Sequence, residues 1–147
     1  MTVIEAHIEH LDLLAPLFDA YRVFYEQPSD LKAARTFLHE RFKNNESVIF
    51  LAMNDNKAIG FTQLYPLFSS VTMQRMFLLN DLYVDPDHRN EGIGEALIDK
   101  AKDLCKSLNF KGLGLQTAKD NPAQKLYERL GFKIDQDLHY FWTNPGQ

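Results

Sequence analysis

The stretch from Val84 to Gly94, Val-Asp-Pro-Asp-His-Arg-Asn-Glu-Gly-Ile-Gly, has the residue types of an anion-binding loop. An apolar run, Met76 to Val84, precedes it, and a strongly periodic helical pattern follows it. The first N–H groups of a helix have no acceptor within the helix, and the helix dipole is positive there. Glycines let a phosphate approach these N–H groups, and Arg89 adds a positive charge. The stretch therefore predicts a pyrophosphate site.

The same stretch also fits a tight strand-to-helix connection with a solvated arginine, because a two-glycine turn is common on its own. Two well-known nucleotide loops are excluded by the residues present. No Gly-Lys-Ser/Thr follows, as a Walker loop requires, and Leu97 stands where the dinucleotide fingerprint has its third glycine.

The elements that must position this loop alternate between strand and helix patterns. Strands are predicted at 2–8, 47–53, 58–65, 73–84 (with a bend or bulge) and 111–117, and further strand material at 132–134 and 137–142. Helices are predicted at 11–25, 29–45, 93–108 and 121–131, with Ser29 and Asn121 as N-caps, and Pro66 is expected to stop regular pairing. The order β-α-α-β-β-β-α-β-α-β predicts an α/β fold with a mixed, mostly antiparallel sheet flanked by helices on both faces.

Length, composition and charge limit the class of protein. With 147 residues, 45% of them apolar and 24% charged, the chain is expected to form a single globular domain, residues 1–147. A net charge of −4 argues against a nucleic-acid partner. The only cysteine, Cys105, lies on an apolar helix face and is predicted to be a buried thiol rather than a nucleophile.

Targeting and metal-binding patterns are not found in the sequence. It has no signal-peptide pattern, no apolar run long enough to span a bilayer and no histidine pair at metal-ligand spacing. We therefore expect a cytoplasmic protein with no membrane segment and no metal.

The second half of the chain resembles the GNAT superfamily of acetyl-CoA-dependent N-acetyltransferases. Leu82-Tyr83-Val84 leading into Arg89-Asn90-Glu91-Gly92-Ile93-Gly94 is similar to the family's pyrophosphate loop. Leu115-Gln116-Thr117 followed by Asn121, and the segment Ala-Gln-Lys-Leu-Tyr-Glu-Arg-Leu-Gly-Phe at 123–132, are similar to two further family motifs. These motifs cover roughly residues 79–134, and the element order of the first half also fits a GNAT-like fold.

The resemblance implies acetyl-CoA as co-substrate and a set of residues that bind it. The pantetheine arm would pair with backbone groups of the strand that carries Leu82, Tyr83 and Val84. The pyrophosphate would rest on backbone N–H groups of the loop: Arg89, Asn90, Glu91, Gly92, Ile93 and Gly94. Arg89 could instead brace the loop. Asn121 would touch the cofactor arm, and an N-cap role is compatible with that contact.

The resemblance also implies an acid and leaves the base open. Tyr127 matches the family's general acid, although it also belongs to an apolar helical stripe and could be a core tyrosine. Asn80 occupies a position where polyamine-type members often carry a glutamate base, and an amide cannot take up a proton. Asp81 is the remaining candidate base, and it would face the other side of the strand unless a bulge re-aims it. A structural role for Asp81, a base acting through water and a substrate that arrives deprotonated are the alternatives.

The expected reaction is direct transfer of acetyl from acetyl-CoA to a primary amine in a ternary complex. Aromatic and acidic residues suit a cationic acceptor, and the candidates are Tyr21, Tyr25, Glu26, Asp30, Tyr65 and Asn80. Tyr21 and Tyr25 could equally be core residues. A small polyamine-like or amino-acid-like amine is the first choice, a protein lysine or N-terminus the second, and a non-catalytic CoA-binding sensor the rival from another class. Members of the family are often dimers, and Tyr140-Phe141-Trp142 could lie at such an interface or in the core.

Overall fold

A five-stranded sheet forms the centre of the first of two units in the computed structural model, which describes residues 1–147. The units are Met1–Gln116 and Thr117–Gln147. The strands lie in the order of the sequence: β1 (Thr2–Glu5), β2 (Val48–Asn54), β3 (Lys57–Ser69), β4 (Gln74–Val84) and β5 (Leu113–Gly114). All neighbours are antiparallel except β4 and β5, which are parallel. The α/β class and the mixed, mostly antiparallel sheet are confirmed.

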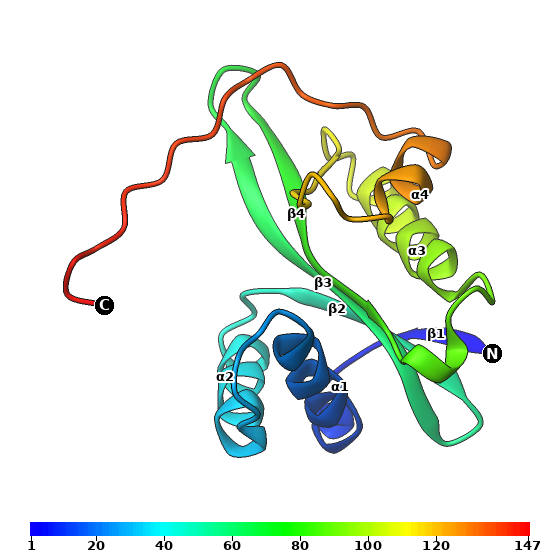
Figure 1. The fold of residues 1–147 in the computed structure, drawn as a ribbon. Helices are drawn as coiled ribbons and strands as arrows, with labels where there is room; N and C mark the ends of the chain where they lie inside the picture. The colour runs from blue at the N-terminus through cyan, green and yellow to red at the C-terminus, as the bar shows by residue number, and fades with distance from the viewer. The chain divides into compact units, whose positions relative to one another are not determined.

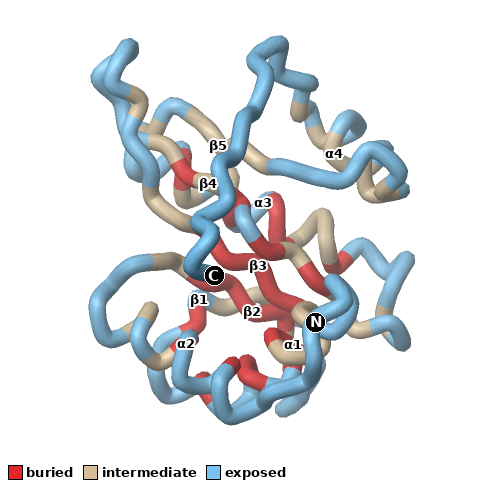
Figure 2. The backbone as a smooth tube through the Cα atoms, turned by 60° about the vertical axis from the view of Figure 1, so that its left-hand side comes forward, coloured by how far each residue is buried: buried red, intermediate tan, exposed pale blue.

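Helices cover both faces of this sheet, as predicted. α1 (Leu11–Phe24) and α2 (Leu31–Lys43) lie on one face, and α3 (Ile93–Ser107) lies on the other (Figure 1). Short 3-10 turns, η1 (Ile8–His10) and η2 (Pro86–His88), precede α1 and α3. Buried residues run along the three central strands (Figure 2), and the helices add their apolar stripes to this core: Leu11, Leu14, Phe18, Ala34 and Leu38 on one face and Ile93, Leu97, Ile98, Ala101 and Cys105 on the other. The prediction that Cys105 is a buried thiol is confirmed.

Two local expectations in this unit were wrong, and each has a physical reason. Asp30, not Ser29, is the N-cap of α2: its side chain accepts a hydrogen bond from Ala33 N, while the Ser29 hydroxyl donates to Asp19. Pro66 does not end β3, since it is paired opposite Phe77. Because β2 ends opposite Leu64, Pro66 lies where β3 has only one neighbouring strand, which is the setting in which a sheet tolerates proline.

A β-bulge interrupts β4 at Asn80. Gln63 is paired with Asp81 and Leu64 with Leu79, so Asn80 has no partner in the ladder. Side chains alternate along a strand, and residues 79 and 81 would share one face without the extra residue. The bulge instead leaves Leu79 on one face and turns Asp81 to the face covered by α1. The predicted irregularity in this strand is confirmed.

β5 is much shorter than the predicted strand at 111–117. It pairs with β4 only at Phe77 and Leu78. From Leu79 to Val84, therefore, β4 is bonded to β3 on one side and has no strand on the other.

The second unit, Thr117–Gln147, contains one helix, α4 (Gln124–Arg129). Asn121 was predicted as the N-cap of this helix, but the N-cap is Ala123, because the helix begins three residues later than expected. Asn121 Oδ1 instead accepts a hydrogen bond from Ala123 N at 2.9 Å, within the turn before α4. Gly131, with φ of 93°, ends the helix as predicted. The strand material expected at 132–134 and 137–142 is not formed. A strand requires a ladder for its backbone groups, and apolar alternation alone does not provide one.

Candidate functional site

The connection from β4 to α3 presents a helix N-terminus beside a left-handed glycine. Gly92 is the N-cap of α3 with φ of 79°, and a Cβ at this position would meet nothing within 4 Å. The first helical hydrogen bond runs from Ala96 N to Gly92 O at 3.0 Å, so the N–H groups of Ile93 and Gly94 have no acceptor within the helix. Open space, directed N–H groups and the positive helix end together suit an anion such as a phosphate.

Hydrogen bonds hold the rest of this loop in a defined shape. Asp85 accepts a bond from Asp87 N at 2.9 Å, and His88 Nδ1 lies 3.2 Å from Glu91 Oε2. Asn90 adopts a positive φ of 63°, which asparagine tolerates better than most residues. The chain's own hydrogen bonds therefore define the shape of the loop.

Arg89 lies across the base of the loop. Its Nε donates to Val84 O at 3.1 Å, and its guanidinium carbon lies 5.6 Å from the Phe24 ring centroid and 5.7 Å from that of Tyr83. Contacts of this kind tie the loop to α1 and β4. They fit the bracing role that the sequence leaves open for Arg89.

The free edge of β4 forms a second binding element beside the loop. Leu82 and Val84 are half-buried, Tyr83 is buried, and the strand has no neighbour on the β5 side at these residues. Each peptide on such an edge offers a donor or an acceptor at fixed spacing. An extended chain with amide groups could pair with it as an additional strand.

Asp81 is the buried carboxylate of the unit, with 3% of its surface exposed. Its Oδ2 accepts a hydrogen bond from Gln63 Nε2 at 2.5 Å, and its Oδ1 accepts one from Asn80 Nδ2 at 2.6 Å. Burial raises the pKa of Asp81, while hydrogen bonds from Gln63, Asn80 and Tyr21 act in the opposite direction. A carboxyl whose pKa is raised towards neutrality is a better base than an exposed one.

Two tyrosines lie close to this carboxylate. The Tyr21 hydroxyl donates to the main-chain oxygen of Asn80 at 3.4 Å and also stabilises the Asp81 carboxylate. Burial, followed by the charge of Asp81, raises the pKa of Tyr21 and raises the pKa of Tyr65 to about 12. Both phenols therefore stay protonated and remain hydrogen-bond donors.

The other predicted acceptor residues make no hydrogen bond to Asp81. The Tyr25 ring packs against Tyr21 at 5.1 Å between centroids and is half exposed. Glu26 lies in the exposed turn after α1 with φ of 65°. Asp30 is used as the N-cap of α2. The structure thus gathers Tyr21, Tyr65 and Asn80 around Asp81 and gives Asp30 a structural task.

Tyr127 and Asn121 belong to the C-terminal unit, where their local contacts are defined. The Tyr127 ring packs edge-on against Phe132 with 6.0 Å between centroids, and its main-chain oxygen accepts a bond from Phe132 N. The side chain of Tyr127 is half-buried on α4. Asn121 makes the turn bond already described and is not the N-cap of α4.

Sequence reasoning missed two residues beside Asp81, Gln63 and Thr62. Both are completely buried, and the Thr62 hydroxyl donates to the main-chain oxygen of Asp81 at 2.8 Å. A visible signal existed, because Thr62-Gln63 is a polar pair inside the apolar run 58–65. Buried polar groups need partners, so a polar pair in a central strand indicates a polar partner on the neighbouring strand.

Similarity to known proteins agrees with this geometry. A model of the acetyltransferase (GNAT) family matches residues 14–132. An uncharacterized N-acetyltransferase of Bacillus subtilis, YhfO, is 44% identical over the full length of both chains. A probable acetyltransferase of Haemophilus influenzae is 35% identical over 96% of each chain. The crystal structure of a probable acetyltransferase superposes with a TM-score of 0.91 at 40% identity, covering 98% of this chain and 97% of the other.

An open sheet edge beside a helix N-terminus is a combination that suits an extended, phosphate-bearing ligand. The chain belongs to the GNAT family of acetyltransferases, whose members use acetyl-CoA as co-substrate. It is accordingly an acyltransferase. No group of three or more His, Cys, Asp or Glu residues is placed to hold a metal ion, and no helix is long and apolar enough to cross a membrane.

Proposed function

We propose that the protein transfers acetyl from acetyl-CoA to a small primary amine, with Asp81 as the general base. The observation that carries the proposal is the position of Asp81: a bulge turns this buried carboxylate to the α1 face of the strand whose free edge begins two residues earlier. The base and the binding edge for the cofactor arm therefore lie on the same short segment of β4.

The residues present fit acetyl-CoA. The edge from Leu79 to Val84 suits the amide groups of a pantetheine arm, and the α3 N-terminus with Gly92 suits a pyrophosphate. Within this proposal, the backbone of Leu82, Tyr83 and Val84 binds the arm. The loop from Arg89 to Gly94 binds the pyrophosphate, with Arg89 bracing it. Asn121 is assigned to the cofactor by its match to the family motif alone.

The chemistry requires two protons to leave the amine nitrogen and one to reach sulfur. Asp81 takes the first proton from the ammonium and later returns it to solvent. The neutral nitrogen then forms the N–C bond as the C–S bond breaks. The Tyr127 hydroxyl, assigned by the family motif, protonates the leaving thiolate, and the second proton from nitrogen replaces the one that Tyr127 gives. One proton is released per turnover.

The surroundings of Asp81 favour a cationic acceptor of small size. Tyr21 and Tyr65 present aromatic rings and phenol groups beside the buried carboxylate, and the Tyr25 ring packs on Tyr21. Aromatic faces and a carboxylate attract an ammonium group, and the carboxylate can then remove its proton. The family model spans residues of both units, which supports one acetyltransferase domain over the whole chain. The proposal also includes a homodimer, for which the exposed aromatic residues Tyr140, Phe141 and Trp142 are the candidate contact, and a cytoplasmic location.

Thiol release from acetyl-CoA measured against a panel of amines tests the proposal. The panel contains polyamines, amino acids, a lysine-containing peptide and a peptide with a free N-terminus. Release with the small amines, and a loss of about 10²–10⁴-fold in kcat for Asp81→Asn with CoA affinity kept, is the expected result. Release only with peptides would assign a protein acceptor, and CoA binding with no release on any amine would assign a sensor.

A further inference from the structure

Gln63 is a buried polar residue for which the proposed chemistry has no role. It is completely buried in β3, directly opposite Asp81 in the ladder, and its neighbours Phe61 and Leu64 are buried apolar residues. Burying a carboxamide costs free energy unless its donors and acceptor are bonded, and an apolar side chain of similar volume would avoid that cost. The amide therefore needs a reason other than packing.

The orientation of the Gln63 carboxamide is fixed from both ends. The Ser47 hydroxyl donates to Oε1 at 2.8 Å, and Nε2 donates to Asp81 Oδ2. Because Ser47 holds the oxygen end, the NH2 end is directed at the carboxylate. The side-chain amide of Asn80 donates to the other carboxylate oxygen, so both oxygens of Asp81 face amide donors.

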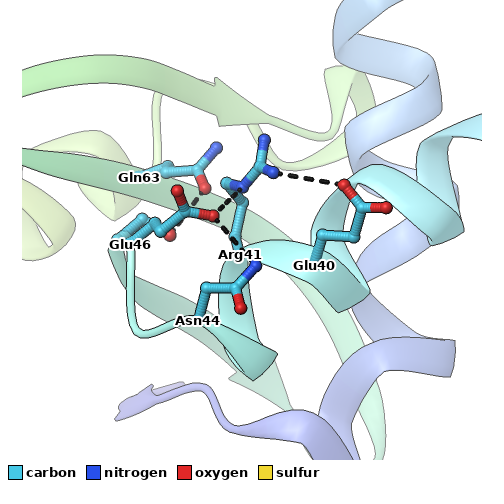
Figure 3. A network of polar contacts seen from close by, with 6 residues as sticks. Glu40, Arg41, Asn44, Glu46 and Gln63 are labelled. Atoms are coloured by element: carbon cyan, nitrogen blue, oxygen red, sulfur yellow. Dashed lines mark hydrogen bonds and ion pairs between the residues drawn. The ribbon is translucent and has the colours of Figure 1, made fainter.

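An ion-pair cluster lies at the end of α2, directly before Ser47 in the chain (Figure 3). Arg41 Nε lies 3.2 Å from Glu46 Oε1, and Arg41 Nη2 lies 3.4 Å from Glu40 Oε2. Asn44 Nδ2 also donates to Glu46 at 3.4 Å. These bonds hold the turn from α2 into β2, and Ser47 is the next residue after Glu46. A continuous set of contacts thus leads from the surface of α2 to Asp81.

We propose that Gln63, anchored by Ser47, is a positioning residue that keeps the Asp81 carboxylate ionised and fixed in direction for proton removal from the amine. This inference rests on the proposed role of Asp81 as general base. Gln63 itself touches neither amine nor acetyl-CoA and acts through Asp81.

The balance of forces on Asp81 explains why such a residue is needed. Burial raises the pKa of the Asp81 carboxyl and so favours its protonated form, and a protonated acid cannot serve as a base. The groups around it are Tyr21 from α1 and Tyr65 from β3, with Arg41 and Glu46 beyond Tyr65 at the end of α2. None of these places a positive charge on Asp81, so amide and phenol donors must provide the stabilisation.

The test uses Gln63→Met, which keeps the volume and removes the donor. The pKa of the Asp81 carboxyl is measured by carbon NMR titration of the full-length protein, with Asp81→Asn used to assign the signal. The pH dependence of kcat/KM for thiol release is measured beside it. Loss of a hydrogen bond to a charged group should raise both pKa values by about one to two units. Activity near neutral pH should fall about 10–100-fold and recover at alkaline pH.

Thr62→Val is the matched control. It lies next to Gln63 in β3, is equally buried and also donates to Asp81, but to the main-chain oxygen and not to the carboxylate. It should change stability without moving either pKa. Ser47→Ala leaves Gln63 in place and frees only its oxygen end, so a shift in the same direction but smaller than that of Gln63→Met is expected. Ser47→Ala also decides the matter if Gln63→Met does not fold.

The outcomes separate this inference from the proposed function. An unchanged pKa of the Asp81 carboxyl in Gln63→Met overturns the inference. If Gln63→Met does not fold, an unchanged pKa in Ser47→Ala overturns it. A shifted carboxyl pKa with an unmoved kinetic profile also overturns it, because Gln63 then has no influence on the rate through Asp81. Failure of the proposed function would appear in different measurements: Asp81→Asn would keep full activity, or no amine would cause thiol release.

Discussion

A carboxylate with 3% of its surface exposed is expensive to keep in its ionised form, and Asp81 is surrounded by the groups that reduce this cost. Gln63 and Asn80 each donate to one of its oxygens, and Tyr21 lies beside them. No cation lies in the hydrogen-bonding shell. Neutral donors stabilise the carboxylate without neutralising it, so it still attracts an ammonium group and can still take its proton.

The environment of Asp81 predicts the pH dependence of folding. Because burial raises its pKa above the ordinary 3.8, the folded chain holds this proton more tightly than the unfolded chain does. The contribution of Asp81 to stability is fully present below pH 3.8 and is lost as the pH rises through the raised folded-state pKa. The free energy of unfolding of the wild type, relative to Asp81→Asn, should therefore fall in urea titrations as the pH rises above 3.8 and through the raised folded-state pKa.

Asp19 offers a control of opposite sign. Hydrogen bonds from Ser29 and from Asp30 N lower the pKa of Asp19 below 3.8. Its stabilisation is present above that value and is lost as the pH falls through the lowered folded-state pKa. The wild type should therefore gain stability over Asp19→Asn as the pH rises. Parallel behaviour of the two variants would contradict the assignment of both environments.

Tyr127→Phe tests the acid assigned by the family motif. The ring and its packing against Phe132 are kept, and only the hydroxyl is lost. We expect kcat for thiol release to fall about 10²–10⁴-fold with the affinity for acetyl-CoA near the wild-type value. Unchanged turnover would remove Tyr127 from the mechanism and leave it as a packing residue of α4.

At the scale of elements, the close approach of α3 to the sheet sets the position of the phosphate loop. Gly60 in β3 makes this approach possible, since a Cβ there would lie 3.1 Å from the main-chain oxygen of Tyr83 and 3.2 Å from Ile93 Cγ2. Ile93 is the first residue of α3, directly after Gly92. The first helical turn therefore packs on a strand position that has no side chain.

Gly60→Ala should move the first turn of α3 and weaken acetyl-CoA binding. The crowding costs about 1–3 kcal/mol of stability by the usual magnitude of overpacking. Gly114→Ala in β5 is the matched control, because a Cβ there meets only Met76 Cε at an ordinary 3.5 Å. Thermal unfolding and CoA titration should distinguish the two variants. Equal affinities would show that the loop position does not depend on Gly60.

The sequence predicts those elements whose signals are local. The periodic stripe of α3 and the glycine loop before it were found with the correct bounds to within a residue, because capping glycines and 3.6-residue periodicity act within a few residues. The predicted strand at 111–117 is longer than β5, and the strands predicted at 132–134 and 137–142 are not formed. Strand pairing depends on a partner that is distant in the chain, so local patterns predict it poorly. The same limit applies to the site: the sequence could nominate Asp81 through the family resemblance, whereas the contact of Gln63 with Asp81 follows only from the pairing of β3 with β4.

For the whole molecule, the C-terminal residues present an unusual amount of exposed apolar surface. Tyr140, Phe141 and Trp142 are 85%, 81% and 78% exposed. Exposed aromatic residues in a row are typical of an interaction surface. Their exposure contradicts the alternative of a core role, and we propose that they form the contact of the proposed homodimer.

Light scattering in solution measures this prediction. The wild type should show about twice the 17.0 kDa of one chain, and replacement of all three aromatic residues by serine should return the mass to that of a monomer. Serine replacement of the exposed Val71 and Met73, in the turn between β3 and β4, is the control for a general loss of apolar surface and should leave the mass unchanged. A wild type of monomer mass at every concentration would contradict the dimer.

The unpaired residue in β4 also affects how relatives of this protein should be aligned. Side-chain direction in β4 changes phase at Asn80, so an acidic residue in a homologue lies on the α1 face or the α3 face according to whether that chain has the extra residue. Deleting the Asn80 codon would remove the bulge, leave Asp81 opposite Gln63 on the α1 face, and take away only the amide that donates to Asp81 Oδ1. Identity of residue type at this position is therefore not enough to transfer a role; the number of residues between the acid and the bulge must match as well.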